Sequence, residues 1–159
     1  MWHTYFFAYL EAPNAISVKN QKKYRKELKS KGKINLVDEH KNIKRQNIIL
    51  NEVQKLKNLG FDKIILSGYS AGGWSSLILQ SRHPEKIIGT IAFNPAFAGP
   101  KKEWQKKYPE WGAFREDSIN KLKKTDTINA IVFAHKADTF EDPKTLSFFE
   151  NFKDLNLID

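Results

Sequence analysis

The chain has 159 residues, 40% of them hydrophobic, with no cysteine and a formal net charge of +9 at pH 7. This length predicts a single domain, residues 1–159, that buries about two-thirds of the surface of its unfolded chain. The lack of cysteine excludes disulfides and cysteine-ligated metal sites. No stretch has the length of a membrane span or the pattern of a signal peptide, so we expect no membrane partner and, by default, a cytoplasmic protein.

The positive charge comes from lysines that are spread along the chain. The densest groups fall in separate connecting segments: Lys22-Lys23, Lys101-Lys102, Lys106-Lys107 and Lys123-Lys124. A nucleic-acid-binding surface would instead gather basic and aromatic residues in one tract. We therefore expect a solvated lysine-rich surface and no nucleic-acid partner, and nucleic-acid binding is the weakest of three hypotheses for function.

The first sixty residues predict two strands and two helices. We expect, in order, a strand over residues 3–10, an exposed helix over 17–31, a short strand over 34–37 and a helix over 39–59. Pro13 and Asn14 stop the first strand. Asp38 is expected to cap the start of the second helix, and Gly60 is expected to end it.

The rest of the chain predicts apolar strands that alternate with helices. We expect strands over 62–67, 87–93, 128–134 and 155–158, and helices over 71–82 and 143–154. Three of the strands are nearly unbroken apolar runs, which is typical of parallel strands that are buried on both faces. The pattern therefore predicts an α/β fold, with a mostly parallel sheet and helices on both faces.

One motif lies between the strand at 62–67 and the helix that follows it. Gly68-Tyr69-Ser70-Ala71-Gly72 fits the pattern G-x-S-x-G, in which a sharp turn exposes the serine hydroxyl. We expect Gly68 and Gly72 to be required, because the turn leaves no room for larger side chains. The helix directs its unpaired N–H groups at any oxyanion that forms there. The alternative is a glycine-rich turn with an incidental serine.

Ser70 shares its expected edge of the sheet with other polar residues. Asn94 and Asp138 also follow apolar strands, and functional groups collect at the carboxyl ends of parallel strands. A second acid, Asp142, follows the same strand as Asp138, but it precedes Pro143 and is expected to cap the next helix. The sequence therefore predicts a site that contains Ser70, Asn94 and Asp138.

The chain resembles the α/β-hydrolase superfamily over roughly residues 38–158. The resemblance rests on four features: the strand and turn Ile64 to Gly72, the His83-Pro84 pair after the next helix, the strand Ile87 to Phe93, and a strand followed by an acid. It implies a three-layer sandwich with Ser70 as the nucleophile and Asp138 as the acid. It also implies that the backbone N–H of Ala71 is an oxyanion donor.

In this family the histidine of the catalytic triad follows the last strand. No histidine follows Asp138, and only about sixty residues precede the turn at Ser70, so the chain resembles the central part of a hydrolase. We expect the triad histidine beyond residue 159. Four histidines are present but are not assigned to the triad: His3, His40, His83 and His135.

The connection over residues 98–125 is charged and rich in aromatic residues. The resemblance implies that it forms a lid over the nucleophile. We expect Trp104 and Trp111 to contact the substrate, together with Tyr69 and Asn94 near the turn. The alternative is that the aromatic residues cover the edge of the sheet.

These features predict a serine hydrolase that acts on an ester or related acyl bond of a small molecule. Such chemistry needs no cofactor, and no cluster of residues has the spacing of metal ligands. The alternative is a non-catalytic, hydrolase-like module that binds a ligand, because a fold alone does not confer function. The oligomeric state is left open.

Overall fold

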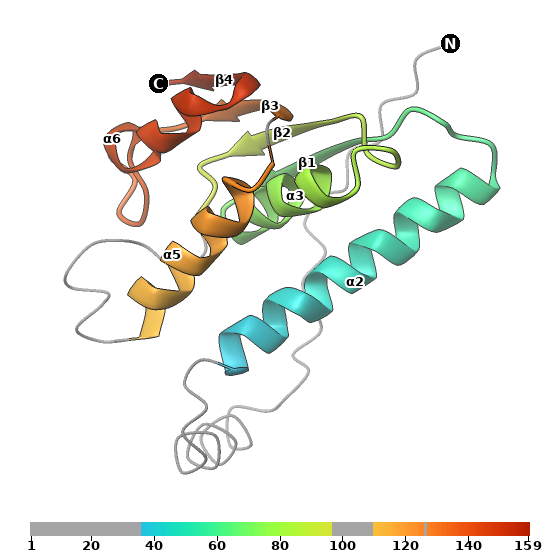
Figure 1. Ribbon diagram of the computed structural model, residues 1–159, viewed down its shortest axis with the longest axis horizontal. Helices are drawn as coiled ribbons and strands as arrows, with labels where there is room; N and C mark the ends of the chain where they lie inside the picture. Colours follow the sequence, from blue (N-terminus) through green and yellow to red (C-terminus); the bar gives the residue numbers. More distant parts are fainter. Residues whose placement is uncertain (1–35, 97–109, 126) are drawn as a thin grey trace.

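The structure, a computed structural model, describes residues 36–96, 110–125 and 127–159 (Figure 1). Its elements in chain order are α2 (Leu36–Asn58), β1 (Ile65–Tyr69), α3 (Ala71–Arg82), β2 (Gly89–Phe93), α5 (Glu110–Leu122), β3 (Thr127–Phe133), α6 (Pro143–Leu146), the 3-10 helix η1 (Ser147–Asn151) and β4 (Lys153–Ile158). The strand expected over 3–10 and the helix expected over 17–31 lie outside these residues. No described helix is both long and apolar enough to cross a membrane.

The described strands form one parallel sheet in the order β1-β2-β3-β4. Because the strands are parallel, the chain returns between them through helices: α3 after β1, α5 after β2, and α6 with η1 after β3. Strands that are added in one direction by crossovers of one hand place their connecting helices on the same face. The predicted α/β fold with a parallel sheet is therefore confirmed.

The face of the sheet beneath these helices forms the core. Register places one buried row of strand residues on it: Leu66, Thr90, Ala130 and Leu155. Trp74 of α3, Leu122 of α5 and Phe149 of η1 are each at most 2% exposed and belong to the same apolar cluster as Ala130. Burying such side chains contributes about 1.5–3 kcal/mol each. The second half of the expected connection over 98–125 is thus a helix that packs on the core.

The opposite face of the sheet carries apolar side chains with much more solvent exposure. Phe93, Ile131 and Ile158 are 41%, 38% and 43% exposed. Phe93 stacks on Phe133, with ring centroids 5.1 Å apart and 8° between the ring planes. Neither apolar cluster of the described residues includes a side chain of this face. The core of the described chain therefore lies on one side of the sheet.

The long helix α2 packs on α3, as the two neighbouring helices in Figure 1 show. Val53 of α2 is fully buried and packs in a cluster with Leu79 of α3. Arg82 Nη1 of α3 also donates to Gln46 Oε1 of α2 at 3.2 Å. These contacts tie the helix before the sheet to the helix that follows Ser70.

The end of α2 was predicted correctly and its start was not. Gly60 has a φ of 90°, and its N–H donates to Lys57 while that of Phe61 donates to Leu56, which is the Schellman ending that favours glycine. At the other end, the helix begins at Leu36. The strand expected over 34–37 is therefore wrong at residues 36–37, and Asp38 is a helical residue and not the N-cap. A short apolar run does not distinguish a strand from the first turn of a helix.

The helix expected over 143–154 is also shorter than predicted. After the four residues of α6, the chain tightens into η1 and then enters β4 at Lys153. Phe149 and Phe152 are both buried, and a tight 3-10 turn brings them into the core within a short connection. The strand expected at 155–158 is confirmed and begins two residues earlier.

Candidate active site

Ser70 occupies the tight turn between β1 and α3, with φ 51° and ψ −123°. A positive φ is strained for a residue with a Cβ and persists only where the surrounding structure holds it. Here the Ser70 N–H donates to the Phe93 carbonyl at 2.9 Å, and the Ser70 carbonyl accepts from the N–H groups of Trp74 at 3.0 Å and Ala96 at 3.2 Å. The next strand and its loop therefore fix the backbone of the turn.

The glycines of the turn differ in how much space they have. A Cβ on Gly68 would lie 2.5 Å from the backbone of Gly72, so this position requires glycine. A Cβ on Gly72 would meet nothing within 4 Å, and the expectation that Gly72 is required is wrong. A Cβ on Gly73 would lie 2.9 Å from the Gly68 carbonyl oxygen and 3.3 Å from Ala92 Cβ. The close approach of helix to strand therefore falls at Gly73, the second glycine of a pair visible in the sequence.

The Ser70 hydroxyl is partly buried, and its Oγ lies 3.4 Å from the Ala96 carbonyl oxygen. It makes no capping bond to the helix. The first N–H groups of a helix have no acceptor within the helix, and in α3 these belong to Ala71, Gly72 and Gly73. They lie beside the hydroxyl at the positive end of the helix dipole. Ala71, the predicted oxyanion donor, is the first residue of this helix.

Asn94 directly follows β2, the strand next to β1. Tyr69 at the end of β1 pairs in register with Phe93 at the end of β2, so the residues that follow them are adjacent. Asn94 has a φ of 41°, a conformation that asparagine tolerates better than most residues, and its N–H donates to the Phe133 carbonyl at 2.7 Å. Tyr69 itself is 57% exposed. Trp104 lies outside the described residues, and of Trp111 only the place in α5 is described.

Asp138 lies in the loop that follows β3, the strand next to β2. Its N–H donates to the His135 carbonyl at 2.9 Å, and its Oδ1 accepts from the N–H groups of Phe140 at 2.7 Å and Glu141 at 2.9 Å. The orientation of the carboxylate is therefore set by the backbone of its own loop. Ser70, Asn94 and Asp138 follow three consecutive strands at one edge of the sheet, as predicted.

Asp142 has the structural role that the sequence predicts. It is the N-cap of α6, where its Oδ1 accepts from the Thr145 N–H at 2.9 Å. In return, the Thr145 hydroxyl accepts from the Asp142 N–H at 2.9 Å, which completes a capping box. A carboxylate held in this way serves the helix start.

The loop also carries a buried ion pair that the sequence does not reveal. Glu141 is fully buried, and both of its oxygens bind Arg115 of α5, with Nε–Oε1 2.6 Å and Nη2–Oε2 3.0 Å. Arg115 Nη2 also donates to the Thr145 carbonyl at 2.8 Å. Burial raises the pKa of the Glu141 carboxyl above its ordinary value, while the bonds from Arg115 oppose this shift. Charged side chains are ordinarily exposed, and these two lie 26 residues apart in the sequence. No sequence signal therefore points to this pair.

Of the histidines whose side chains the structure describes, neither His83 nor His135 is bonded to Ser70 or Asp138, and of His40 only the place in α2 is described. His83 is the C-cap of α3, at the opposite end of that helix from Ser70, and its Nδ1 lies 3.6 Å from Glu85 Oε1. His135 is exposed, and its Nδ1 accepts from the Ala137 N–H at 3.1 Å. Within the described residues, no group of three potential ligands is placed to hold a metal ion.

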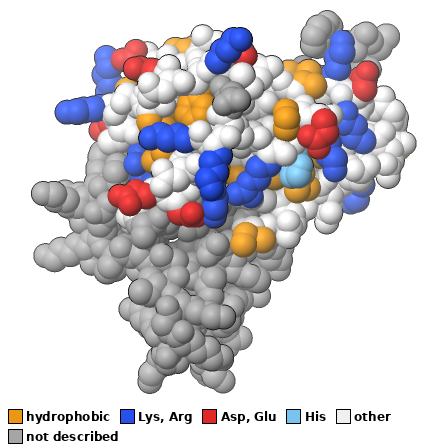
Figure 2. Space-filling view, in the orientation of Figure 1, with side chains coloured by type: hydrophobic (Ala, Val, Ile, Leu, Met, Phe, Trp, Pro, Cys, Tyr) orange, Lys and Arg blue, Asp and Glu red, His pale blue; other side chains and the backbone are white. Residues whose placement is uncertain are grey.

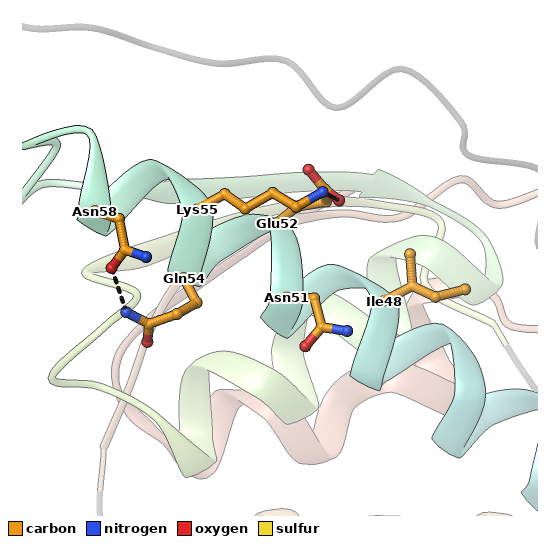
Figure 3. Close-up of a pocket in the computed structure, with 6 residues that line it drawn as sticks. All are labelled: Ile48, Asn51, Glu52, Gln54, Lys55 and Asn58. Carbon is orange, nitrogen blue, oxygen red and sulfur yellow. Dashed lines mark hydrogen bonds and ion pairs between the residues drawn. The ribbon is translucent and has the colours of Figure 1, made fainter.

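A hollow of about 410 Å³ lies along α2, and only residues of that helix are described in its lining (Figure 3). They are Ile48, Asn51, Glu52, Gln54, Lys55 and Asn58. Two pairs of them are already bonded to each other, Gln54 to Asn58 at 3.0 Å and Lys55 to Glu52 at 2.7 Å. The hollow contains none of the predicted site residues and is a feature of the helix surface.

Two comparisons find no match and one finds structural relatives. No family model and no curated protein sequence matches the chain. Among solved structures, the monoacylglycerol lipase of Paleococcus ferrophilus matches with a TM-score of 0.55 and 18% identity, over 74% of this chain and 64% of the lipase. An α/β-hydrolase enzyme from a Medee basin deep-sea metagenome library matches with a TM-score of 0.42 and 14% identity, over 67% of this chain and 61% of the enzyme.

The match to the lipase establishes the fold of this chain. Together with the parallel sheet and the helix that follows Ser70, it shows that the chain has the α/β-hydrolase fold, as the sequence resemblance implied. The chain spans under two-thirds of the length of either matching protein. The established similarity is therefore one of architecture over the shared part.

Proposed function

We propose that this chain carries the nucleophile and the acid of a serine hydrolase, which acts on an ester or related acyl bond of a small molecule. The observation that carries the proposal is the backbone of Ser70, held at φ 51° between a parallel strand and a helix N-terminus. Strain at a residue of this kind is characteristic of functional sites, and a serine between strand and helix is the geometry of a nucleophile turn.

In the proposed reaction, Ser70 Oγ attacks the acyl carbon and a histidine accepts its proton. The N–H of Ala71 stabilises the oxyanion that forms. The histidine returns the proton to the departing alcohol, which leaves an acyl group on Ser70. Water then attacks this acyl group, with the histidine as base, and releases the acid. The mechanism requires no cofactor.

Asp138 is the proposed acid that orients the histidine. Its competitor Asp142 is engaged in the capping box of α6, whereas Asp138 lies in the loop at the carboxyl end of β3 with its carboxylate held by two N–H groups. The base itself is proposed to come from chain that follows residue 159, where the sequence resemblance implies it; His83 and His135, whose side chains are described, are not bonded to these residues.

The proposed substrate is a small acyl compound that approaches the carboxyl edge of the sheet. Exposed Tyr69 and partly buried Asn94 flank Ser70 there and are proposed to contact it. Trp104 and Trp111 remain sequence-based expectations for the same role. The matching protein is, by its name, a monoacylglycerol lipase, so an ester of that general kind is a suitable first substrate to test.

Labelling with a fluorophosphonate probe tests the nucleophile. In the full-length protein, extended past residue 159 to include the proposed histidine, we expect one probe per chain, attached to Ser70 and absent in Ser70→Ala. Ser81→Ala is the control, because this hydroxyl of the same helix donates to a backbone carbonyl at 2.9 Å and its loss should leave labelling unchanged. Failure of the wild-type chain to label would overturn the proposal in favour of a non-catalytic ligand-binding module.

A further inference from the structure

A continuous chain of contacts joins α5 to the proposed catalytic acid. Arg115 of α5 binds both oxygens of the Glu141 carboxylate. The backbone N–H of Glu141 in turn donates to Asp138 Oδ1 at 2.9 Å. Arg115 is therefore linked to Asp138 through a single intermediate residue, Glu141.

The segment from Asp138 to Thr145 comprises the loop after β3 and the start of α6, and it is held at several points along its length. Asp138 Oδ1 holds the loop from one end, and the capping box of Asp142 and Thr145 holds it from the other. Arg115 binds between these points, to the Glu141 side chain and to the Thr145 carbonyl. Its guanidinium also lies 5.7 Å from the centre of the Phe148 ring, a distance at which cation–π attraction contributes.

The ion pair is an inefficient means of stabilising the fold. The Glu141 side chain is 0% exposed and that of Arg115 is 14% exposed. Removing two charges from water costs several kcal/mol per ion before their attraction offsets it, and apolar residues of similar volume often stabilise a protein as well or better. What the planar, two-bond contact supplies is a defined geometry. In this loop the geometry that it defines is the orientation of the Glu141 peptide unit.

We propose that Arg115 and Glu141 are positioning residues for the Asp138 carboxylate. By anchoring the Glu141 side chain in the core, Arg115 fixes the N–H that holds Asp138 Oδ1 and so fixes the direction in which Asp138 presents its charge. The proposal deepens the proposed function and rests on it, since Asp138 must be the acid for its orientation to affect catalysis. Neither Arg115 nor Glu141 contacts the reacting atoms.

Hydrogen exchange of the 159-residue chain tests the positioning itself. In Arg115→Met, we expect the amides of Phe140 and Glu141 to exchange about tenfold faster or more, relative to the Ala134 amide, which donates to Ile158 in the sheet. Leu122→Ala is the matched control, because it removes a fully buried side chain at the last residue of α5 and keeps Arg115, and it should leave that ratio unchanged. Unchanged protection of Phe140 and Glu141 in Arg115→Met would overturn the proposal.

A second variant covers the case in which Arg115→Met does not fold. Arg115→Lys keeps a cation for Glu141 but loses the two parallel bonds. We expect it to fold and to show the same selective increase in exchange at Phe140 and Glu141, by a smaller factor. Wild-type protection at both amides in Arg115→Lys would show that the two-bond contact does not hold the loop, and would contradict the proposal.

Ester hydrolysis by the full-length protein tests the consequence for catalysis. We expect Arg115→Lys to lower kcat about tenfold with little change in KM, because an imidazole that is poorly oriented affects the chemical step more than binding. Leu122→Ala should keep kcat at temperatures where it is folded. If Arg115→Lys shows faster exchange at Phe140 and Glu141 but keeps the wild-type kcat, the role of Arg115 in positioning Asp138 for catalysis is overturned. A wild-type chain that does not acylate Ser70 would instead reject the proposed function, while the exchange result would still decide whether Arg115 holds Asp138.

Discussion

Two glycines beside Ser70, Gly68 and Gly72, provide a sharp test of the turn at the scale of single residues. We expect Gly68→Ala to destabilise the chain by about 1–3 kcal/mol, because its Cβ would lie 2.5 Å from backbone atoms that cannot easily move. Gly72→Ala should be neutral or stabilise the chain by up to about 1 kcal/mol, because a Cβ there meets nothing and alanine favours the helix. Urea denaturation of both variants measures the difference. Equal effects at the two positions would contradict the geometry of the turn.

The two aspartates after β3 are separated by a pair of matched substitutions. We expect Asp138→Asn to lower kcat of the full-length enzyme by roughly 10⁴-fold, because an amide favours the wrong tautomer of the histidine. Asp142→Asn should leave kcat nearly unchanged and cost about 1 kcal/mol of stability or less, because asparagine still caps α6. Steady-state kinetics and thermal denaturation measure both variants. Loss of activity at residue 142 with activity kept at 138 would reverse the assignment.

At the scale of elements, the ion pair between α5 and the loop after β3 makes folding stability depend on pH. Burial raises the pKa of the Glu141 carboxyl, so the folded state binds more protons than the unfolded state above the ordinary value of 4.5. Stability from this group is therefore present below pH 4.5 and decreases as the pH rises through the folded pKa.

The pH dependence is measured against Glu141→Gln, which cannot titrate. We expect the free energy of unfolding of the wild type, relative to that of Glu141→Gln, to decrease as the pH rises above 4.5. The variant should match the wild type most closely at low pH, where the Glu141 carboxyl is protonated and, like glutamine, carries no charge. Urea denaturation at several pH values gives the difference directly. A relative stability that increases with pH would show that the bonds from Arg115 outweigh the effect of burial.

Element boundaries illustrate which local signals are reliable. The end of α2 at Gly60 was predictable, because a left-handed residue after a helix calls for glycine. The helix α3 was predicted with its observed bounds, because Ser70 and His83-Pro84 delimit it. The start of α2 and the division of 143–154 into α6, η1 and β4 were not predictable. A short apolar run before α2 fits a strand as well as the first turn of a helix. The division of 143–154 depends on tertiary packing, such as the burial of Phe149 and Phe152, which overrides local propensity.

At the scale of the whole molecule, the parallel sheet and the common edge of Ser70, Asn94 and Asp138 followed from the pattern of apolar runs alone. The hydrogen-bond partners of these residues could not be predicted in this way, because bonds such as that from Ser70 to Phe93 join segments that are far apart in the sequence. Arg115 and Glu141 escaped prediction for the same reason, since their contact exists only after α5 packs beside the loop. Lys and Arg side chains are interspersed with Asp and Glu over the surface seen in Figure 2, and the absence of a nucleic-acid partner stays a prediction.

The parallel topology has a consequence for the order of events in folding. No pair of strands in the described sheet is joined by a hairpin, so every pairing waits until an intervening helix has brought distant segments together. Such non-local contacts slow folding, because the entropy of closing a long loop is lost before any contact compensates for it. Two of the three backbone bonds that hold Ser70 in its strained conformation involve Phe93 and Ala96, which lie beyond the first of these crossovers. We therefore expect the chain around Ser70 to reach its observed conformation only after β2 has joined β1.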